Sequence, residues 1–509
     1  MRLPSRSFFG FFSGAAGALA LAAAFHLIAW GKETEPAIRV ETTPVNRDAK
    51  IGASYAAVVK KASPSVVNIY TTRTVHMRVV NPLFNDPFFR QFSQLFGDQF
   101  GLGANRVLTQ KQRSLGSGVI VSPDGYILTA NHVVAGADEV KVKVADQKEY
   151  TARIVGKDPP TDVAVLKIDA KDLPAITLAD SDQLEVGDVV LAIGNPFGLS
   201  RTVTMGIVSA LGRSGLRVFS QYQDFIQTDA PINEGNSGGA LIDAEGRLIG
   251  INDAIFSSNG GNLGIGFAVP INMARYVMDH LIRSGKVTRG NLEGVSIQDV
   301  TPDLAAGFNL PDQKGALVAD VLSDSAAQKA GLKSGDVITG FNGKDVSDAH
   351  ALQLLVAESL PGSSATIKLV RDGVEKTVEV TLTEMRGDMA PEETSPDNLA
   401  SPDQTRTDAL DGVTVADLQP SVRAQLNVPA DIKGALVYDV DPDSNAADAG
   451  LQRGNLILEI NHQPVRVAAD AVRLGRQAKG GVILLKIWRR EGSFAGTQFI
   501  TVDNIKKKK

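Results

Sequence analysis

The 509-residue chain has no cysteine and only six histidines. The lack of cysteine excludes disulfide bonds, a thiolate nucleophile and cysteine-ligated zinc, and it suits an oxidising compartment. A His-Glu-x-x-His sequence is also missing, so neither a dedicated metal site nor a cofactor is expected. The net charge of −5 argues against nucleic acid as the main partner.

The composition is that of a folded chain with several domains. Apolar residues make up 43% and charged residues 21% of the sequence, which indicates a globular rather than a disordered or fibrous protein. A chain of 509 residues is expected to form about three domains.

The N-terminus carries an export signal. Arg2 and Arg6 precede a nearly unbroken apolar run over residues 8–30. Residues 1–30 are therefore interpreted as a cleaved signal peptide or as a membrane anchor, and the sequence leaves both open. In either case the rest of the protein is exported, because the basic end stays inside. Residues 31–50 are polar and form a spacer.

Residues 114–270 consist of short β-branched segments separated by Gly, Asp and Pro turns, which predicts a β-barrel or sandwich. Apolar residues at helical spacing predict a helix over 272–283, ended by Gly285. Before this region, residues 75–112 hold a phenylalanine-rich segment. It is either an amphipathic helix that caps the domain or a long loop that docks on another subunit or on a catalytic site. Its phenylalanines are Phe84, Phe88, Phe89, Phe92, Phe96 and Phe100.

The C-terminal part of the chain contains an internal repeat. The sequence KGALV at 314–318 recurs at 433–437, and AGL at 330–332 recurs at 449–451, both 119 positions later. Two modules of one fold are therefore expected after the β-rich domain. The domains are predicted at 51–286, 287–385 and 408–503, with a flexible linker at 386–407 and a basic tail at 504–509.

A glycine-rich stretch at 231–240 holds Ser237, a candidate nucleophile. Acyl transfer needs an exposed serine oxygen, a base that removes its proton, and an acceptor that orients the base. His132 is the only histidine within the same β-rich region outside the phenylalanine-rich segment and the helix, and it follows a strand. Asp162 begins a later apolar strand pattern, at 162–168. The order His, Asp, Ser occurs in one known class of serine proteases.

These residues also carry a family resemblance. The sequences TANHV at 129–133, TDVA at 161–164 and GNSGG at 235–239 resemble the three catalytic blocks of the HtrA (DegP/DegQ-like) periplasmic serine endoproteases. The resemblance implies a mostly β protein with a chymotrypsin-like double β-barrel protease domain and two PDZ domains.

Site residues follow from the resemblance by position. It implies Ser237 as nucleophile, His132 as general base and Asp162 as the group that orients the imidazole. The N–H groups of Gly235 and Ser237 would form the oxyanion hole. The substrate would contact Gly235, Asn236 and the loop made of Asp253, Ala254, Ile255, Phe256 and Ser257. The family assembles as homotrimers and larger cages.

PDZ domains add an extended peptide as a strand and hold its terminal carboxylate in a loop of backbone N–H groups. The first copy would use Leu292, Gly294 and Val295, and the second would use Leu410, Asp411, Gly412 and Val413. Glu293 separates Leu292 from Gly294 in the first copy. Its charge opposes a ligand carboxylate, so binding of C-terminal peptides by this copy stays open.

The sequence thus predicts an ATP-independent serine endopeptidase of the periplasm that degrades unfolded or damaged envelope proteins. Two alternatives remain. The protein is instead a chaperone-like holdase or peptide-sensing scaffold with minor proteolysis, or a membrane-tethered regulatory protease with one signalling substrate.

Overall fold

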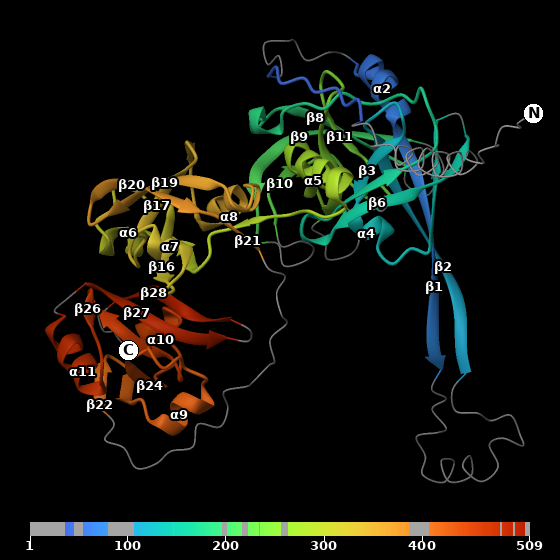
Figure 1. The fold of residues 1–509 in the computed structure, drawn as a ribbon. Coiled ribbons are helices and arrows are strands. Elements are labelled where there is room, and N and C mark those ends of the chain that lie inside the picture. Colours follow the sequence, from blue (N-terminus) through green and yellow to red (C-terminus); the bar gives the residue numbers. More distant parts are fainter. Residues whose placement is uncertain are drawn as a thin grey trace, which may run out of the picture. The chain divides into compact units, whose positions relative to one another are not determined.

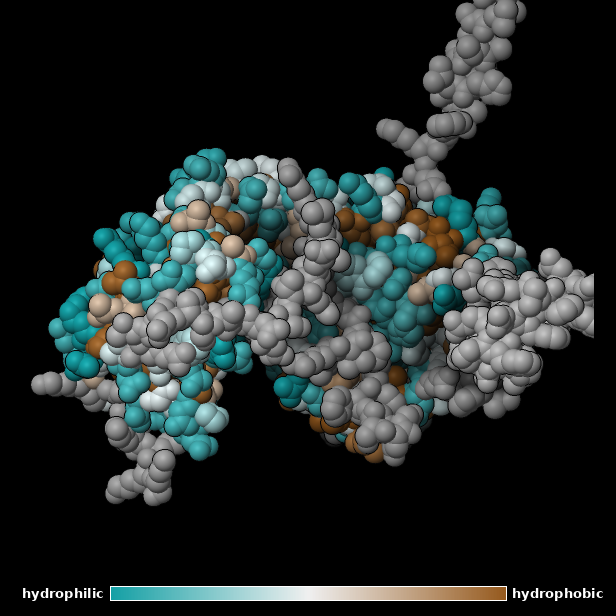
Figure 2. All heavy atoms as spheres, turned by 90° about the horizontal axis from the view of Figure 1, so that it is seen from below, coloured by the Kyte–Doolittle hydropathy of each residue, from teal (hydrophilic) through white to brown (hydrophobic). Residues whose placement is uncertain are grey.

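A computed structural model describes residues 36–44, 54–79, 106–145, 147–195, 201–215, 222–233, 235–255, 263–385, 407–478, 481–491 and 494–503. The chain divides into two compact units, residues 1–287 and 288–509 (Figure 1). On the visible face of the molecule, hydrophilic residues predominate and apolar residues lie in small groups (Figure 2). No described helix has both the length and the apolar character needed to cross a bilayer. Residues 1–30, which hold the predicted signal peptide or anchor, lie outside the described residues.

The first unit begins with a seven-stranded sheet in the order β5-β4-β1-β2-β3-β7-β6. Its core consists of fully buried aliphatic side chains such as Ile69, Ile127 and Leu166. The turns predicted from Gly, Asp and Pro separate these strands as expected. The strands are β1 (Val66–Val79), β2 (Arg106–Ile120), β3 (Tyr126–Ala130), β4 (Glu139–Lys143), β5 (Glu149–Thr151), β6 (Arg153–Asp158) and β7 (Val163–Lys167).

A closed barrel follows in the order β10-β13-β12-β11-β8-β9. It encloses a second core that includes Val190, Ile226 and Leu241. The predicted helix is confirmed as α5 (Ile271–Ser284), which ends at Gly285 with a φ of 72°. The barrel strands are β8 (Val189–Gly194), β9 (Thr202–Arg213), β10 (Phe225–Thr228), β11 (Ala240–Asp243), β12 (Leu248–Ile255) and β13 (Gly266–Pro270). Short helices of this unit are α2 (Ala56–Ala62), η1 (Ser63–Ser65), α4 (Asn131–Val134), η3 (Pro159–Thr161) and η4 (Ser181–Gln183).

Strands β1 and β2 form a long antiparallel ribbon that extends beyond the sheet (Figure 1). Their pairing continues to Val79 and Arg106. Both ends of the phenylalanine-rich segment, 75–79 and 106–112, are therefore strands rather than loop or helix. The six phenylalanines themselves lie outside the described residues.

The second unit consists of two copies of one fold, as the repeat predicted. Ala316 begins β16 and Ala435 begins β24, 119 positions apart, and α7, β17, β18 and α8 recur at the same spacing. The first copy contains β14 (Gly290–Asn291), β15 (Val295–Asp299), α6 (Pro302–Gly307), β16 (Ala316–Val321), α7 (Ala326–Lys329), β17 (Val337–Phe341), β18 (Lys344–Asp345), α8 (Ala349–Ala357), β19 (Ser364–Arg371), β20 (Val374–Thr381) and β21 (Thr383–Glu384). The second contains β22 (Thr407–Leu410), β23 (Val413–Asp417), α9 (Pro420–Gln425), β24 (Ala435–Val440), α10 (Asn445–Asp448), β25 (Leu456–Ile460), β26 (Gln463–Pro464), α11 (Ala468–Gln477), β27 (Val482–Glu491) and β28 (Phe494–Asp503).

The two copies differ at one sheet edge. In the first copy, β15 pairs only with β16 among the described strands, so its outer edge is unpaired. In the second copy, β23 pairs with β24 on one side and with β22 on the other. The edge that would accept an added strand is therefore open in the first copy and already paired in the second.

Candidate active site

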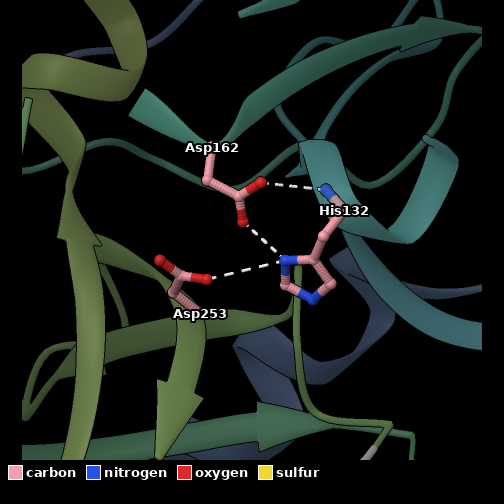
Figure 3. Close-up of side chains that lie close together, drawn as sticks. All are labelled: His132, Asp162 and Asp253. Atoms are coloured by element: carbon pink, nitrogen blue, oxygen red, sulfur yellow. Dashed lines mark hydrogen bonds and ion pairs between the residues drawn. The ribbon is translucent and has the colours of Figure 1, made fainter. Parts of the chain in front are cut away.

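His132 lies in the short helix α4, directly after β3, whose five residues are all buried. The strand fixes the backbone, while the imidazole remains 42% exposed. Its Nδ1 lies 2.5 Å from Oδ2 of Asp162 (Figure 3). Nε2 points away from the neighbouring carboxylates in the same view. The imidazole is therefore held by one nitrogen and presents the other.

Asp162 is held by its backbone as well as by its side chain. It ends the helix η3 with a φ of 57°, a left-handed conformation that aspartate tolerates better than most residues. Its Oδ1 accepts a hydrogen bond from the backbone N–H of His132 at 2.9 Å, and its carbonyl accepts one from Asn131 at 2.8 Å. The buried carboxylate thus contacts both the backbone and the imidazole of His132, which fixes the position of the ring and its tautomer.

The loop that carries Ser237 is anchored on both sides. The carbonyl of Ser237 accepts a hydrogen bond from Ser117 at 2.9 Å, and the N–H of Gly238 donates to Asn252 at 2.7 Å. Gly238 has a φ of 79° and packs so closely on Thr129 and Ala130 that a Cβ would not fit. The serine loop thus lies against the end of the strand that leads to His132.

The hydroxyl of Ser237, which is half-buried, makes no hydrogen bond within the described residues, and none to His132. Catalytic hydrogen bonds of this kind are often absent before substrate binds. The structure brings His132 and Asp162 into contact and places the Ser237 loop beside them, without the serine–histidine hydrogen bond.

Two N–H groups of this loop are available to a ligand. Asn236 and Gly239 donate their N–H groups to Asn233 and Asn236, respectively. Within the described part of the loop, the N–H groups of Gly235 and Ser237 donate no hydrogen bond. Gly235 has a φ of 94°, which favours glycine. These are the two donors that the sequence assigned to the oxyanion hole.

The predicted substrate residues fall into three groups. Asn236 is 1% exposed and its side chain packs against Gly194, away from solvent. Ala254 and Ile255 are the last residues of β12. Phe256 and Ser257 lie outside the described residues. The substrate-binding role of this loop stays a prediction.

Asp253, which the resemblance assigns to the substrate-binding loop, lies beside His132 and Asp162. Its carboxylate is 1% exposed and Oδ1 lies 3.6 Å from Nδ1 of His132 (Figure 3). Burial, and then the negative charge of Asp162, raise the pKa of Asp253 well above its ordinary value. Sequence reasoning missed this position, although one acidic residue inside the apolar strand at 248–255 was a usable signal.

His132, Asp162 and Asp253 form a cluster whose ligand-type atoms lie within 4.8 Å of one another. A metal ion with bonds of about 2 Å separates its ligand atoms by about 3 Å or more. Nδ1 of His132 and Oδ2 of Asp162 are in direct contact at 2.5 Å. The arrangement is that of a base and its acceptor, not of ligands around an ion.

The predicted carboxylate loops have the same shape in both copies. Gly294 and Gly412 have φ values of 82° and 72°, and Leu292 and Leu410 are buried. Glu293 is exposed, as is Asp411, the acidic residue at the same place in the second loop. In both copies an acidic residue thus stands between the leucine and the glycine of the loop, so its charge does not distinguish the first copy from the second. Val295 and Val413 begin the strands β15 and β23.

Comparisons with known families agree with this architecture. Residues 116–251 match the model of the trypsin-like peptidase domain, and residues 290–382 and 436–489 each match a PDZ domain model. The HtrA-type protease AlgW with tripeptide is a similar solved structure. It is 44% identical with a TM-score of 0.53, and the match covers 66% of this chain and 98% of that one.

Two curated relatives extend over most of the chain. A probable periplasmic serine endoprotease DegP-like from Chlamydia trachomatis is 40% identical over 456 residues, 86% of this chain and 87% of the relative. The periplasmic serine endoprotease DegP of Salmonella typhimurium is 40% identical over 471 residues, 90% of this chain and 94% of the relative. The chain therefore belongs to the HtrA family of DegP-like periplasmic serine endoproteases, with a trypsin-like peptidase domain followed by two PDZ domains.

Proposed function

We propose that this serine endopeptidase degrades unfolded or damaged proteins in the periplasm, with Ser237 as nucleophile, His132 as base and Asp162 as orienting group. One observation carries the assignment of the site. The buried carboxylate of Asp162 contacts both Nδ1 and the backbone N–H of His132, at 2.5 and 2.9 Å. A carboxylate in this position keeps the proton on Nδ1, so that Nε2 is free to accept one.

The reaction then follows from the chemistry of these groups. Nε2 of His132 removes the proton of Ser237 as Oγ attacks the scissile carbonyl, and Asp162 stabilises the imidazolium. The N–H groups of Gly235 and Ser237 bind the oxyanion, and each donor contributes about 3–4 kcal/mol in this type of site. His132 gives the proton to the leaving amine, and water hydrolyses the acyl-enzyme by the same path.

A segment of substrate has to be extended to reach this loop, which favours unfolded chains. The strand β12 ends at Ile255, within the predicted substrate loop at 253–257, and the apolar members of that loop suit small aliphatic residues before the cut. No nucleotide-binding feature is needed for this reaction, so the cleavage is proposed to be independent of ATP.

Peptide capture is proposed for the first PDZ domain, where no described strand pairs with the outer edge of β15, beside α8. A bound peptide extends the sheet there, with Leu292, Gly294 and Val295 at its end. In the second domain, β22 already pairs along β23. Leu410, Asp411, Gly412 and Val413 form the turn between these two strands, so a ligand has to displace β22.

A matched pair of variants tests this difference. A labelled peptide with an apolar C-terminus is titrated against Ser237→Ala protein that also carries Gly294→Ala or Gly412→Ala. Both glycines have positive φ and are crowded by a serine, Ser325 or Ser444. Only Gly294→Ala is expected to weaken binding, by about tenfold or more. Equal weakening in both variants contradicts the assignment, and melting curves report whether each domain remains folded.

Location and assembly are proposed from the relatives and the sequence. The body of the protein is periplasmic, and residues 1–30 serve as a cleaved signal or a tether. N-terminal sequencing of the mature protein separates these two. A homotrimer or larger cage is proposed from the family, and sedimentation velocity of the full-length protein tests it.

The decisive experiment compares wild type with Ser237→Ala on an unfolded substrate and on the same protein folded. Wild type is expected to degrade casein, and Ser237→Ala is expected to bind casein without cleaving it. Protection of an aggregating protein by both forms, with little cleavage by either, supports a holdase instead. Cleavage of one native protein but not of casein supports a regulatory protease.

A further inference from the structure

A second carboxylate lies inside the proposed catalytic site. Asp253 is on β12, at a bulge where Asn252 pairs with Ala268 and Ala254 pairs with Phe267. A bulge redirects a side chain relative to its neighbours on the strand, and bulges are common beside active sites. Here it turns the carboxylate of Asp253 toward His132 and Asp162 (Figure 3).

Among the described residues, only His132 lies within ion-pair distance of the carboxylate of Asp253. Both oxygens of Asp253 are buried and neither has a hydrogen-bond partner in the described residues. The nearest basic nitrogen is Nδ1 of His132 at 3.6 Å, and no lysine or arginine lies within ion-pair distance of Asp253 in the described part of the chain. The elements packed against β12 are β3, β11, β13 and α5. None of them places a charged side chain that pairs with Asp253, so His132 and Asp162 are the charged groups that face it.

The proton count of the site follows from these contacts. Asp162 accepts two hydrogen bonds from His132, one from the backbone N–H and one from Nδ1. If Asp162 and Asp253 were both ionised, two negative charges would lie side by side in a buried site with a single imidazole, which is strongly unfavourable. Burial and the charge of Asp162 both raise the pKa of Asp253. A single proton shared between these two carboxylates removes the repulsion, and Asp253 is the more deeply buried of the two.

The position of that proton is restricted by what each neighbour accepts. A neutral carboxylic acid has one O–H donor, and a buried donor needs an acceptor. Nδ1 of His132 already donates its own hydrogen to Asp162, so it is not an acceptor. The carboxylate of Asp162 still has lone pairs to spare after it has accepted the two hydrogen bonds from His132.

We propose that Asp253 is a positioning residue of the active site, a neutral carboxylic acid that donates its O–H to Asp162 and holds that carboxylate against His132. The proposal rests on the proposed catalytic roles of His132 and Asp162. The hydrogen bond stabilises the charge of Asp162 and makes it a weaker acceptor for an imidazolium. The carboxylate of Asp162 is thereby held where it orients the imidazole of His132 and keeps the proton on Nδ1. When Asp253 loses its proton, this bridge is replaced by repulsion, which adds a second ionisation on the alkaline side of the activity profile.

The test is the pH profile of kcat/KM for a fluorogenic peptide, measured for wild type, Asp253→Leu and Asp253→Asn. Leucine has a similar volume but no donor, so kcat is expected to fall about tenfold, the effect of one lost hydrogen bond to a charged group. Asparagine donates a permanent N–H and is expected to restore most of the activity, without the alkaline ionisation.

Asp243→Asn is the matched control, because Asp243 is a buried acid on the neighbouring strand β11 that pairs with Arg247, away from the triad. It is expected to lower the melting temperature and leave the pH profile unchanged. Two results overturn the proposal. In one, Asp253→Asn is as impaired as Asp253→Leu at every pH, which means that Asp253 acts as an ionised group. In the other, all three profiles coincide, which means that Asp253 is only structural.

A second measurement does not depend on activity. The infrared spectrum of Ser237→Ala protein is expected to contain a carbonyl band of a protonated carboxyl that disappears when Asp253→Asn is added. Absence of this difference at neutral pH refutes the proposal. If wild type and Ser237→Ala cleave casein equally, the proposed function fails instead, whatever the infrared spectrum shows.

Discussion

Asp162→Asn is the substitution whose consequence follows most directly from the geometry. The two carboxylate oxygens of Asp162 face two donors of His132, its backbone N–H at 2.9 Å and Nδ1 at 2.5 Å. An amide has one oxygen and one NH₂ group, so it satisfies only one of these donors. If the oxygen stays on the backbone N–H, the NH₂ group faces Nδ1. The hydrogen of the imidazole then moves to Nε2, which is no longer a base.

The expected loss is large because the wrong tautomer removes general-base catalysis. Substitutions of this kind in serine proteases lower kcat by about 10⁴, which is about 5.4 kcal/mol at 1.36 kcal/mol per tenfold change. KM is expected to change little, since Asp162 is buried and does not reach the substrate. Asp253 is the nearest replacement acceptor, 3.6 Å from Nδ1, so Asp162→Asn with Asp253→Asn is expected to lose a further factor of about ten.

Hydrolysis of a fluorogenic peptide between pH 5 and 9 measures both effects, with melting curves as the control for folding. Asp253 is more effective as an acceptor when it is ionised, so the single variant is expected to recover part of its activity as the pH rises. A loss of less than tenfold in a folded Asp162→Asn protein refutes the assigned role of Asp162. Equal activity in the single and double variants refutes the rescue by Asp253.

Three further predictions concern stability. Gly238→Ala places a Cβ against Ser117 at a residue whose φ is 79°. Backbone strain of about 1–2 kcal/mol and overcrowding of about 1–3 kcal/mol are expected to lower the free energy of unfolding, measured in urea. Unchanged stability and activity would count against the close packing. For Asp253, the raised pKa means that the folded state keeps a proton that the unfolded state loses. As the pH rises from the pKa of Asp253 in the unfolded state to its pKa in the folded state, the free energy of unfolding of wild type is therefore expected to fall by up to about 1.4 kcal/mol per pH unit. Asp253→Asn is expected to lack this fall when its stability is measured by calorimetry over the same pH range. Stability curves of the two proteins that run parallel with pH contradict the prediction. Asp336 is fully buried and forms two hydrogen bonds with Arg371, at 2.5 and 2.6 Å. Asp336→Ala is expected to lower the free energy of unfolding by about 3–5 kcal/mol, because Arg371 loses its partner. Asp336→Asn is expected to lower it less, because the amide oxygen still accepts a hydrogen bond from the backbone N–H of Lys333. Chemical denaturation that finds Asp336→Asn to be the less stable of the two variants contradicts this.

Local patterns in the sequence were sufficient for most of the architecture. The short β-branched segments predicted strands because alternate residues on a strand face the same side, and the helix at 272–283 was predicted by its apolar spacing and by Gly285. The repeat at a spacing of 119 residues predicted two copies of one module, which the structure and the family comparisons confirm. The catalytic blocks around His132, Asp162 and Ser237 were sufficient to identify the family, which the comparisons confirm. Each of these inferences depends on residues that are close in sequence, or on a motif that is preserved as a block.

The tertiary structure decided the features that depend on residues far apart in the chain. Asp162 and Asp253 are 91 positions apart, and no local pattern indicates that a bulge in β12 turns the second carboxylate toward the first. The same holds for the sheet edges of the two PDZ domains. The edge of β23 is paired with β22 in the second domain, whereas no described strand pairs with the equivalent edge of β15 in the first. The sequence alone determines which side chains are available and how each segment folds locally. Only the packing of separate strands determines which charges share a buried site, because desolvation and Coulomb repulsion act over distances in space and not along the chain.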